Sequence, residues 1–448
     1  MTLLIQKVLT IIIGKKITDV SFSGYIAKNS IRLFLINCIA LILGFISNYV
    51  LIKVAGVSTY GAYVYIFNLL YLLAAFCVVG TDTLLVKKIA VYEATANYAE
   101  WKGILLFSLG MIMAGIILVT AFSVITFGST WIIEKKVSIN WLLLSFLSLL
   151  MLAITMFNQA SLQALRKVFF SQVTEKIIRP LLLIIPVLIL FYRNNTINAE
   201  ELVWMNIIAV GVATLITIIL HKHNLPVAFK MVPAQYKFAG WIRTSFAFFL
   251  LDIFYIFNSR IDVFLLGLYR PDKEVGIYNI TLRLSELIGF GLIIMNFLLA
   301  PLIARIYASS KRENLQRVIT RSARAVLLIS LPLAVTIFLF RHSVLSFFDA
   351  DTLNSSIALV ILCAGQLLNV FCGSPGLLLN MTGHQKFSIL SLAAGTILNL
   401  ALSMLLVPAY GLIGTAIATA SSLVAWNLIM YFFVRTKLKI HTTAFAGI

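Results

Sequence analysis

Residues 53–63 have the sequence KVAGVSTYGAY, and part of this stretch recurs in the second half of the chain. Two positions repeat at an offset of 215 residues, Gly61 and Tyr63 as Gly276 and Tyr278. Further along, Leu162-Gln163 and Phe170 correspond to Leu379-Asn380 and Phe387 at an offset of 217. Each match is weak alone, but two nearly equal offsets together predict that one structural unit has been duplicated.

The composition is that of a membrane protein. Of the 448 residues, 61% are hydrophobic and 11% are charged, and the mean hydropathy is +1.01. A soluble domain has about 25% charged residues, so a soluble multidomain enzyme is excluded. A membrane-spanning helix needs about 20 mainly apolar residues. Twelve such stretches lie at residues 33–52, 61–80, 104–127, 141–160, 172–192, 202–220, 244–268, 276–300, 325–345, 357–380, 388–407 and 411–434. The sequence therefore predicts an all-α integral membrane protein with about 12 transmembrane helices.

The basic residues are distributed unevenly between the two alternating sets of loops. The set that contains both termini holds 26 of the 35 Lys and Arg residues, the other set holds seven, and two lie within spans. Since basic residues accumulate in cytoplasmic loops, we expect both termini in the cytoplasm. The net charge of +19 does not indicate a nucleic-acid partner, because the basic residues form short clusters between apolar runs.

The duplication and the loop charges predict five segments. They are a cytoplasmic N-terminal lead-in at 1–30, a six-helix bundle at 31–220, a cytoplasmic basic linker at 221–243, a second six-helix bundle at 244–435 and a cytoplasmic tail at 436–448. Because six is an even number, both bundles run in the same sense. We therefore expect a pseudo-two-fold axis along the membrane normal and a central cavity between the bundles.

Glycines mark the hairpin between the first two helices of each bundle. A short hairpin needs glycine where the chain turns and where helix backbones approach closely. The expected hairpin glycines are Gly56, Gly61, Gly267 and Gly276. Ordinary loop glycines are the alternative, but they do not explain why both hairpins carry glycine at the same place.

At the level of motifs, the chain resembles the polysaccharide-transporter branch of the MOP exporter superfamily and is most similar to the Wzx-type O-antigen flippases. The resemblance runs from about residue 28 to residue 435. Its carriers are Gly56 with Tyr60 and Gly61, residues 260–267, residues 275–278, Pro301 and residues 407–416. Where that family commonly has Arg before Leu-Gly in the first hairpin, this chain has Lys53 followed by Val, Ala and Gly56.

This resemblance implies a function as well as a fold. It implies alternating access by two bundles in the bacterial inner membrane. The implied substrate is an undecaprenyl-diphosphate-linked oligosaccharide that moves from the cytoplasmic to the periplasmic leaflet, as in O-antigen and lipopolysaccharide biosynthesis. A polysaccharide polymerase and a chain-length regulator are the implied partners, besides membrane lipids. Lys53 is then a candidate substrate contact.

Charges within spans are concentrated in the second half of the chain. The seventh span has Asp252, Arg260 and Asp262, and the eighth has Arg283 and Glu286, one helical turn apart. The apolar cores of the first six spans are interpreted as lacking acidic residues. Each charge at a helix centre costs at least about 2.5 to 3.5 kcal/mol, so these residues need a structural or functional reason.

Two interpretations of these charges stay open. The charges neutralise each other and pin the two helices together, or Arg260 and Arg283 face the cavity and bind the lipid diphosphate. Arginine suits the second role because its guanidinium stays charged and binds phosphate oxygens in a fork. In that case Asp252, Asp262 and Glu286 are the candidates for gating, or for coupling to a proton or sodium ion.

Uncharged polar residues extend the candidate cavity. Asn258 lies between Asp252 and Asp262 on one polar stripe of the seventh span. Asn48 lies on a milder stripe of the first span, where close helix packing and contact with sugar hydroxyls are the alternatives.

Other classes of function find little support. The sequence has no P-loop, no HExxH motif and no CxxC pair, so no ATP motor, metal site, catalytic residue or cofactor is predicted. A multidrug or cation exporter of the same superfamily is the first rival, favoured if the cavity has unpaired carboxylates. A membrane polymerase or ligase is the second rival, but it needs a large external loop, and the longest expected here has about 13 residues.

Overall fold

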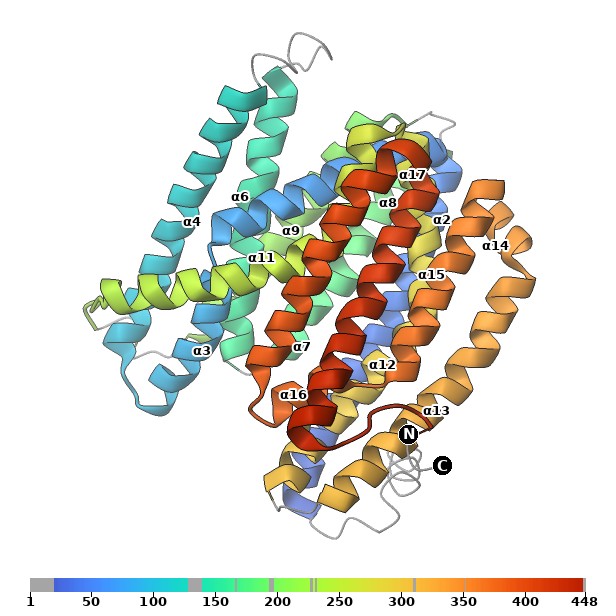
Figure 1. Ribbon diagram of the computed structural model, residues 1–448. Coiled ribbons are helices and arrows are strands. Elements are labelled where there is room, and N and C mark those ends of the chain that lie inside the picture. Colours follow the sequence, from blue (N-terminus) through green and yellow to red (C-terminus); the bar gives the residue numbers. More distant parts are fainter. Residues whose placement is uncertain are drawn as a thin grey trace. The chain divides into compact units, whose positions relative to one another are not determined.

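The computed structural model describes residues 20–127, 139–165, 167–192, 197–225, 229, 232–308, 312–350 and 352–445. In these ranges the regular secondary structure is helical and no strand occurs (Figure 1). The helices form two compact units. Ile36–Arg260 make up one, and the described residues up to Leu35 together with those from Ile261 onward make up the other. The chain passes from one unit to the other twice, each time within a helix, at residues 35–36 and at residues 260–261, and the predicted domain limits stay a prediction.

The Ile36–Arg260 unit contains the helices from α2 to the first part of α11. They are α2 (Val20–Val78, whose start belongs to the other unit), α3 (Thr81–Ala94), α4 (Tyr98–Phe127), α6 (Ile139–Ala164), α7 (Val168–Val173), η1 (Thr174–Ile178), α8 (Arg179–Tyr192), α9 (Ala199–Asn224) and α11 (Phe238–Tyr269, up to Arg260). The segment η1 is one turn of π-helix between α7 and α8.

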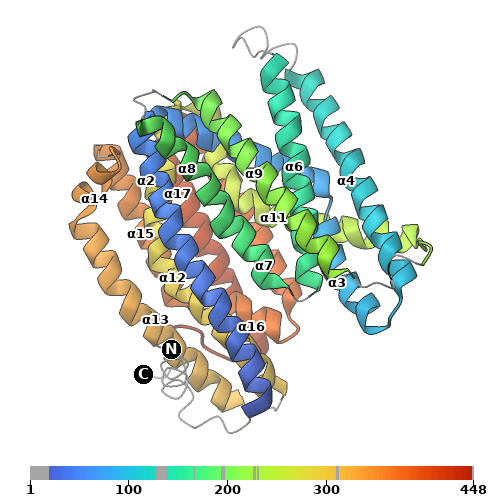
Figure 2. The ribbon, with the colours of Figure 1, turned by 180° about the vertical axis from the view of Figure 1, so that it is seen from behind.

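The second unit contains the later helices. They are α12 (Asp272–Ala308), α13 (Arg312–Leu339), α14 (Arg341–Phe347), α15 (Leu353–Cys372), α16 (Pro375–Met381) and α17 (Gln385–Leu438). Within this unit α13 and α15 lie side by side and α14 connects them at one end, as the two opposite views show (Figures 1 and 2).

Eight helices in the described part of the chain are long and apolar enough to cross a membrane. Two of them, α2 and α17, each consist of two helices joined at a glycine with non-helical φ and ψ. The predicted fifth span lies on α7, η1 and α8, and the predicted seventh span lies on α11. The prediction of an all-α, multi-pass membrane protein is confirmed, whereas the count of twelve spans and the pseudo-two-fold axis stay predictions.

Two buried tryptophans fix the start of α11, the helix that carries Asp252 and Arg260. Trp101 on α4 and Trp241 on α11 are both almost completely buried. The Trp241 indole nitrogen donates to Tyr92 Oη on α3 at 3.1 Å, which satisfies its one polar atom. The close packing of these two large side chains therefore joins the start of α11 to α3 and α4.

The two halves of α17 meet at Gly411, where φ is 50° and ψ is −123°. Arg270 donates to the carbonyl oxygens of Pro408 and Ala409, both at 2.9 Å, near the end of the first half. The backbone N–H of Leu412, at the start of the second half, donates to Glu274 Oε2 at 3.1 Å. Backbone groups at helix ends lack hydrogen-bond partners within the helix. Here the Arg270 side chain bonds to carbonyls at the end of the first half, and the Glu274 side chain bonds to an N–H at the start of the second half.

Residues 439–445 pack against the helices of the second unit. The side-chain amide of Gln316 on α13 forms two hydrogen bonds with the backbone of His441, at 2.7 and 2.8 Å. Thr442 Oγ1 donates to the carbonyl of Cys372 at 2.6 Å, and Thr442 is fully buried. The described part of the predicted tail at 436–448 therefore belongs to the core of this unit. Most of the predicted lead-in at 1–30 lies outside the described residues.

We expect Gly411→Ala to destabilise the protein. Alanine at this position would have to keep the positive φ of Gly411, which L-residues rarely adopt. Its Cβ would also clash with the Glu274 carboxylate. A strained conformation of this kind costs about 1 to 3 kcal/mol. The melting temperature of the purified protein in detergent should fall accordingly. Gly110→Ala on α4, where an added Cβ meets open space, is the control and should leave the melting temperature unchanged or raise it. Equal effects of the two substitutions would contradict the strained junction.

Candidate functional site

Three aromatic residues lie one helical turn apart on the second half of α2. Tyr63 and Phe67 are stacked with ring centroids 6.0 Å apart, and Phe67 meets Tyr71 edge-on at 5.1 Å. The spacing of four residues places them on one face of the helix. Arg179, Arg260 and Glu175 contact residues of this aromatic face.

An ion pair lies within the fifth predicted span. Glu175 belongs to the π-helical turn η1 and Arg179 begins α8, four residues later, and the Arg179 guanidinium pairs with the Glu175 carboxylate. Their side chains are 22% and 12% exposed, respectively. Single π-helical turns within α-helices are frequent at functional sites. The guanidinium also lies 4.4 Å from the centroid of the Phe67 ring, a cation–π distance.

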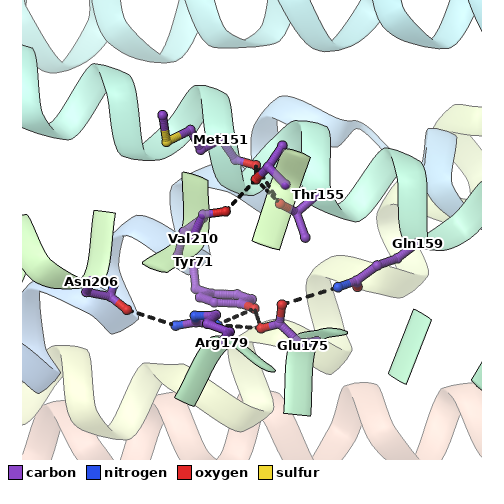
Figure 3. Close-up of polar contacts among 9 residues, drawn as sticks. Tyr71, Met151, Thr155, Gln159, Glu175, Arg179, Asn206 and Val210 are labelled. Carbon is purple, nitrogen blue, oxygen red and sulfur yellow. Dashed lines mark hydrogen bonds and ion pairs between the residues drawn. The ribbon is translucent and has the colours of Figure 1, made fainter. Parts of the chain in front are cut away.

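Three further helices supply hydrogen bonds to this ion pair, as Figure 3 shows. Tyr71 Oη donates to Glu175 Oε1 at 2.7 Å, and Gln159 Nε2 on α6 donates to Oε2 at 3.2 Å. Arg179 Nη2 donates to Asn206 Oδ1 on α9 at 3.4 Å. Both carboxylate oxygens therefore accept hydrogen bonds. The network joins α2, α6, α8 and α9 around one partly buried charge pair, and we call it the Glu175 network.

A threonine pair next to the network fastens α6 to α9. Thr155 Oγ1 and Thr214 Oγ1 are 2.6 Å apart, and both hydroxyls also bond to main-chain carbonyls (Figure 3). Hydroxyl bonds between helices compensate for the absence of water in a membrane. Gln159 and Asn206 are thereby held at fixed positions on either side of the ion pair.

A second guanidinium lies against the same aromatic face. The Arg260 guanidinium carbon is 5.0 Å from the centroid of the Tyr71 ring, and Arg260 Nη1 donates to Asn68 Oδ1. The Arg179 guanidinium lies 5.8 Å from the same ring centroid. The Tyr71 ring is therefore close to two arginines, one from α8 and one from α11.

The other predicted site residues of this unit lie apart from the Glu175 network in sequence and have their own contacts. Tyr60 Oη donates to Asn48 Oδ1 at 3.0 Å across the Gly56 junction, as the close-packing interpretation of Asn48 requires. Thr83 Oγ1 donates to Asp252 Oδ2 at 3.3 Å. Lys53 is exposed and lies 6.0 Å from the ring centroid of Tyr49.

Asn258, on the last turns of α11 in this unit, is partly buried.

Asp262 is a buried carboxylate of the second unit, 2% exposed. Its Oδ2 accepts hydrogen bonds from Tyr278 Oη on α12 at 2.6 Å and from Thr419 Oγ1 on α17 at 3.3 Å. Its Oδ1 accepts from the backbone N–H of Val263 at 2.8 Å. These bonds attach the end of α11 to two helices of the second unit.

Arg283 and Glu286 form an ion pair within α12, with Nη1 and Oε2 3.0 Å apart. The prediction that they are neighbours on one helix face is confirmed. Their side chains are 47% and 42% exposed, so this pair is far more accessible than the pair of Glu175 with Arg179.

The four hairpin glycines have different surroundings. Gly56 has a φ of 82° and forms the junction between the two helices of α2. Gly61, Gly267 and Gly276 lie inside helices, and in the second unit the chain turns at residues 270–271, after Gly267 at the end of α11 and before Gly276 in α12. The turn there contains Pro271, so the two hairpins use different residues for the reversal.

The interpretation that the first six spans lack acidic residues in their apolar cores is wrong. Glu175 lies in the fifth predicted span, and Arg179 is its partner. Arg179 is one of the 26 basic residues predicted from the sequence to lie in the cytoplasmic loops. Both residues precede Pro180, and the continuous apolar run starts only after it, which makes this end of the span resemble a loop. The spacing of four residues between Glu and Arg is the signal that indicates a pair on one helix face.

Two family models match the chain. A model described as polysaccharide biosynthesis protein matches residues 26–307, and a model named MatE matches residues 248–405. A probable low-salt glycan biosynthesis flippase of Haloferax volcanii is 23% identical over 186 residues. That match spans 41% of this chain and 38% of the relative.

Solved transporter structures share the fold. The lipid II flippase MurJ in an inward closed conformation has a TM-score of 0.68 at 16% identity, covering 90% of this chain and 87% of that one. An inward-facing multidrug resistance MATE family transporter of the MOP superfamily has a TM-score of 0.66 at 13% identity, covering 89% and 94%. The chain therefore shares the fold of these two transporters. Because the first family model covers well over half of its residues, the chain belongs to the polysaccharide biosynthesis protein family.

Proposed function

We propose that this chain moves a lipid-linked oligosaccharide from one membrane leaflet to the other by alternating access. Support comes from its family and from the Haloferax volcanii relative, whose name describes a glycan biosynthesis flippase. A structure of the same fold is named as a lipid II flippase. No covalent bond changes in such a process, so the chain acts as a transporter and not as an enzyme.

The observation that carries the proposal is the position of two arginines beside Tyr71. Arg179 and Arg260 lie against one aromatic ring, and with Glu175 they form a group of two guanidiniums and one carboxylate. The net charge of this group is positive and suits an anionic substrate. A guanidinium binds two phosphate oxygens at once, which matches the diphosphate of a polyprenyl-linked sugar.

The finer assignments extend this proposal. The substrate is an undecaprenyl-diphosphate-linked repeat unit of O-antigen or a related surface polysaccharide, carried from the cytoplasmic to the periplasmic leaflet of a bacterial inner membrane. Arg283 and Lys53 are further contacts for the diphosphate or its sugar, and Asn48 and Asn258 are contacts for sugar hydroxyls. A polysaccharide polymerase and a chain-length regulator act on the product.

Ion coupling is proposed for the in-span carboxylates of the second half of the chain. Asp252, Asp262 and Glu286 are the candidates to exchange a proton or sodium ion during the cycle. In support, Asp262 is buried and its carboxylate is bonded to two hydroxyls that link α12 to α17. A change of its charge would therefore alter contacts between helices of that unit.

A multidrug or cation exporter is the second candidate function. It is favoured by the MatE model, which matches residues 248–405 and thus includes Asp252, Asp262 and Glu286. A cationic substrate would need these carboxylates as its direct partners. The two functions therefore differ in which charged residues contact the substrate, and substitution of the arginines separates them.

We expect removal of one member of the Glu175 network's ion pair to destabilise the protein. Glu175→Gln leaves the Arg179 charge, which is 12% exposed, without its carboxylate partner, and this should cost more than the at most about 1 kcal/mol of an exposed pair. Protein abundance and melting temperature should both fall. Replacing Glu175 by Leu together with Arg179 by Met should restore abundance but not transport, because the guanidinium is missing.

The pair in α12 is the matched control for this experiment. Glu286→Gln breaks an exposed pair of similar spacing and should cost at most about 1 kcal/mol. Equal losses for Glu175→Gln and Glu286→Gln would contradict the difference in burial between the two pairs.

We expect Arg260→Ala to abolish surface polysaccharide in a complemented flippase-null strain while protein level stays normal. Loss of a charge-assisted bond to phosphate should lower transport about tenfold to a hundredfold. Arg260→Lys should recover part of the activity, because charge remains but the fork is lost. Arg435→Ala, an exposed arginine at the end of α17, is the control and should behave like wild type. Normal polysaccharide in Arg260→Ala would remove Arg260 from substrate recognition.

The proposed orientation predicts opposite labelling of two exposed positions. Single cysteines at Lys53 and Arg317 in a background without the four native cysteines should react with membrane-impermeant maleimides from the periplasmic and the cytoplasmic side, respectively. Reaction of both positions from the same side would be incompatible with the loop assignment.

A further inference from the structure

A groove of about 240 Å³ lies between α13 and α15, away from the Glu175 network in the chain. Its walls are aliphatic and aromatic, and they include Val335 and Phe338 from α13 and Val360 and Ala364 from α15. Val335 and Phe338 are each about half exposed. Because both helices are long and apolar enough to span a membrane, the natural solvent of this groove is hydrocarbon.

One charged residue, Arg341, closes the groove at one end. It follows directly after α13, whose candidate span ends at Leu339, so it lies at the boundary between hydrocarbon and headgroups. Lipid phosphates occupy that level of a bilayer.

The local structure holds Arg341 in a fixed orientation. Nε donates to Ser356 Oγ on α15 at 2.8 Å, and Nη1 donates to the carbonyl of Phe338 at 2.9 Å. The guanidinium carbon lies 5.0 Å from the ring centroid of Phe338. Among the ion pairs of the described residues, none includes Arg341.

We propose that this groove binds an anionic phospholipid of the surrounding bilayer, which is not transported. One acyl chain lies between α13 and α15, and the phosphate bonds to the Arg341 guanidinium. The groove supplies an apolar channel that opens toward lipid, and Arg341 supplies the complementary charge at its headgroup end. Such a lipid bridges α13 and α15 and stabilises the second unit. This site does not depend on which substrate the protein transports.

The test measures lipid binding to the full-length purified protein in neutral detergent by native mass spectrometry, with melting temperature as second readout. The probes are dioleoyl phosphatidylglycerol, dioleoyl phosphatidylcholine with the same acyl chains, and inorganic phosphate alone. We expect phosphatidylglycerol to bind about tenfold more tightly than phosphatidylcholine, since a charge-assisted hydrogen bond is gained. Inorganic phosphate alone should not raise the melting temperature.

Four variants decide between the groove and non-specific binding. Arg341→Gln should lose the preference for phosphatidylglycerol, and Arg341→Lys should keep most of it because the charge remains. Ala364→Phe, at an exposed position of the groove wall, should weaken the binding of both lipids. Arg435→Gln, an exposed arginine elsewhere in the unit, should bind like wild type.

An unchanged preference in Arg341→Gln, or wild-type binding in Ala364→Phe, would overturn the proposal. Equal binding of the two lipids by the wild-type protein, or stabilisation by inorganic phosphate alone, would also overturn it. If Arg341→Gln does not fold, the lysine and phenylalanine variants still decide the outcome.

Discussion

The ion pair of Glu175 with Arg179 places two opposite charges in the apolar part of the Ile36–Arg260 unit, and neither is stable there alone. Removing a charge from water costs several kcal/mol, and the cost is recovered only if the partner and further hydrogen bonds are well placed. Tyr71, Gln159 and Asn206 provide those bonds from three other helices. The relative positions of α2, α6, α8 and α9 are thus tied to one electrostatic requirement.

The hydrogen bonds that satisfy this ion pair also position the residues of the proposed substrate site. The ring of Tyr71 lies against Arg260, and its hydroxyl bonds to Glu175, which pairs with Arg179. Tyr71 therefore helps to position both arginines. Guanidinium groups held by rings and amides lose little side-chain entropy when a phosphate binds. In the second unit, Arg270 and Glu274 use the same principle on backbone groups and stabilise the junction of α17 at Gly411.

The sequence predicts features that depend on local pattern. Apolar stretches of about 20 residues identify the spans, and the glycine at position 56 identifies the first hairpin. The spacing of three residues between Arg283 and Glu286 is sufficient to predict their ion pair. Each of these signals lies within one or two helical turns or one span, so no tertiary information is needed.

Contacts between distant segments are not predictable in this way. Tyr71 and Glu175 are 104 residues apart, and Arg270 lies 138 residues from Pro408. No pattern in a single sequence connects such positions, and for this reason the hydrogen bonds of Glu175 and the contacts of Arg270 could not be predicted from the sequence.

Reconstitution in proteoliposomes tests the central claim most directly. The assay follows whether a polyprenyl-diphosphate-linked oligosaccharide placed in one leaflet becomes accessible to a membrane-impermeant glycan-oxidising reagent on the other side. The account predicts transfer by the wild-type protein and its loss in Arg260→Ala at equal protein amount. Absence of transfer by the wild-type protein, together with export of a cationic dye that depends on Asp262, would contradict it and would favour the cation exporter.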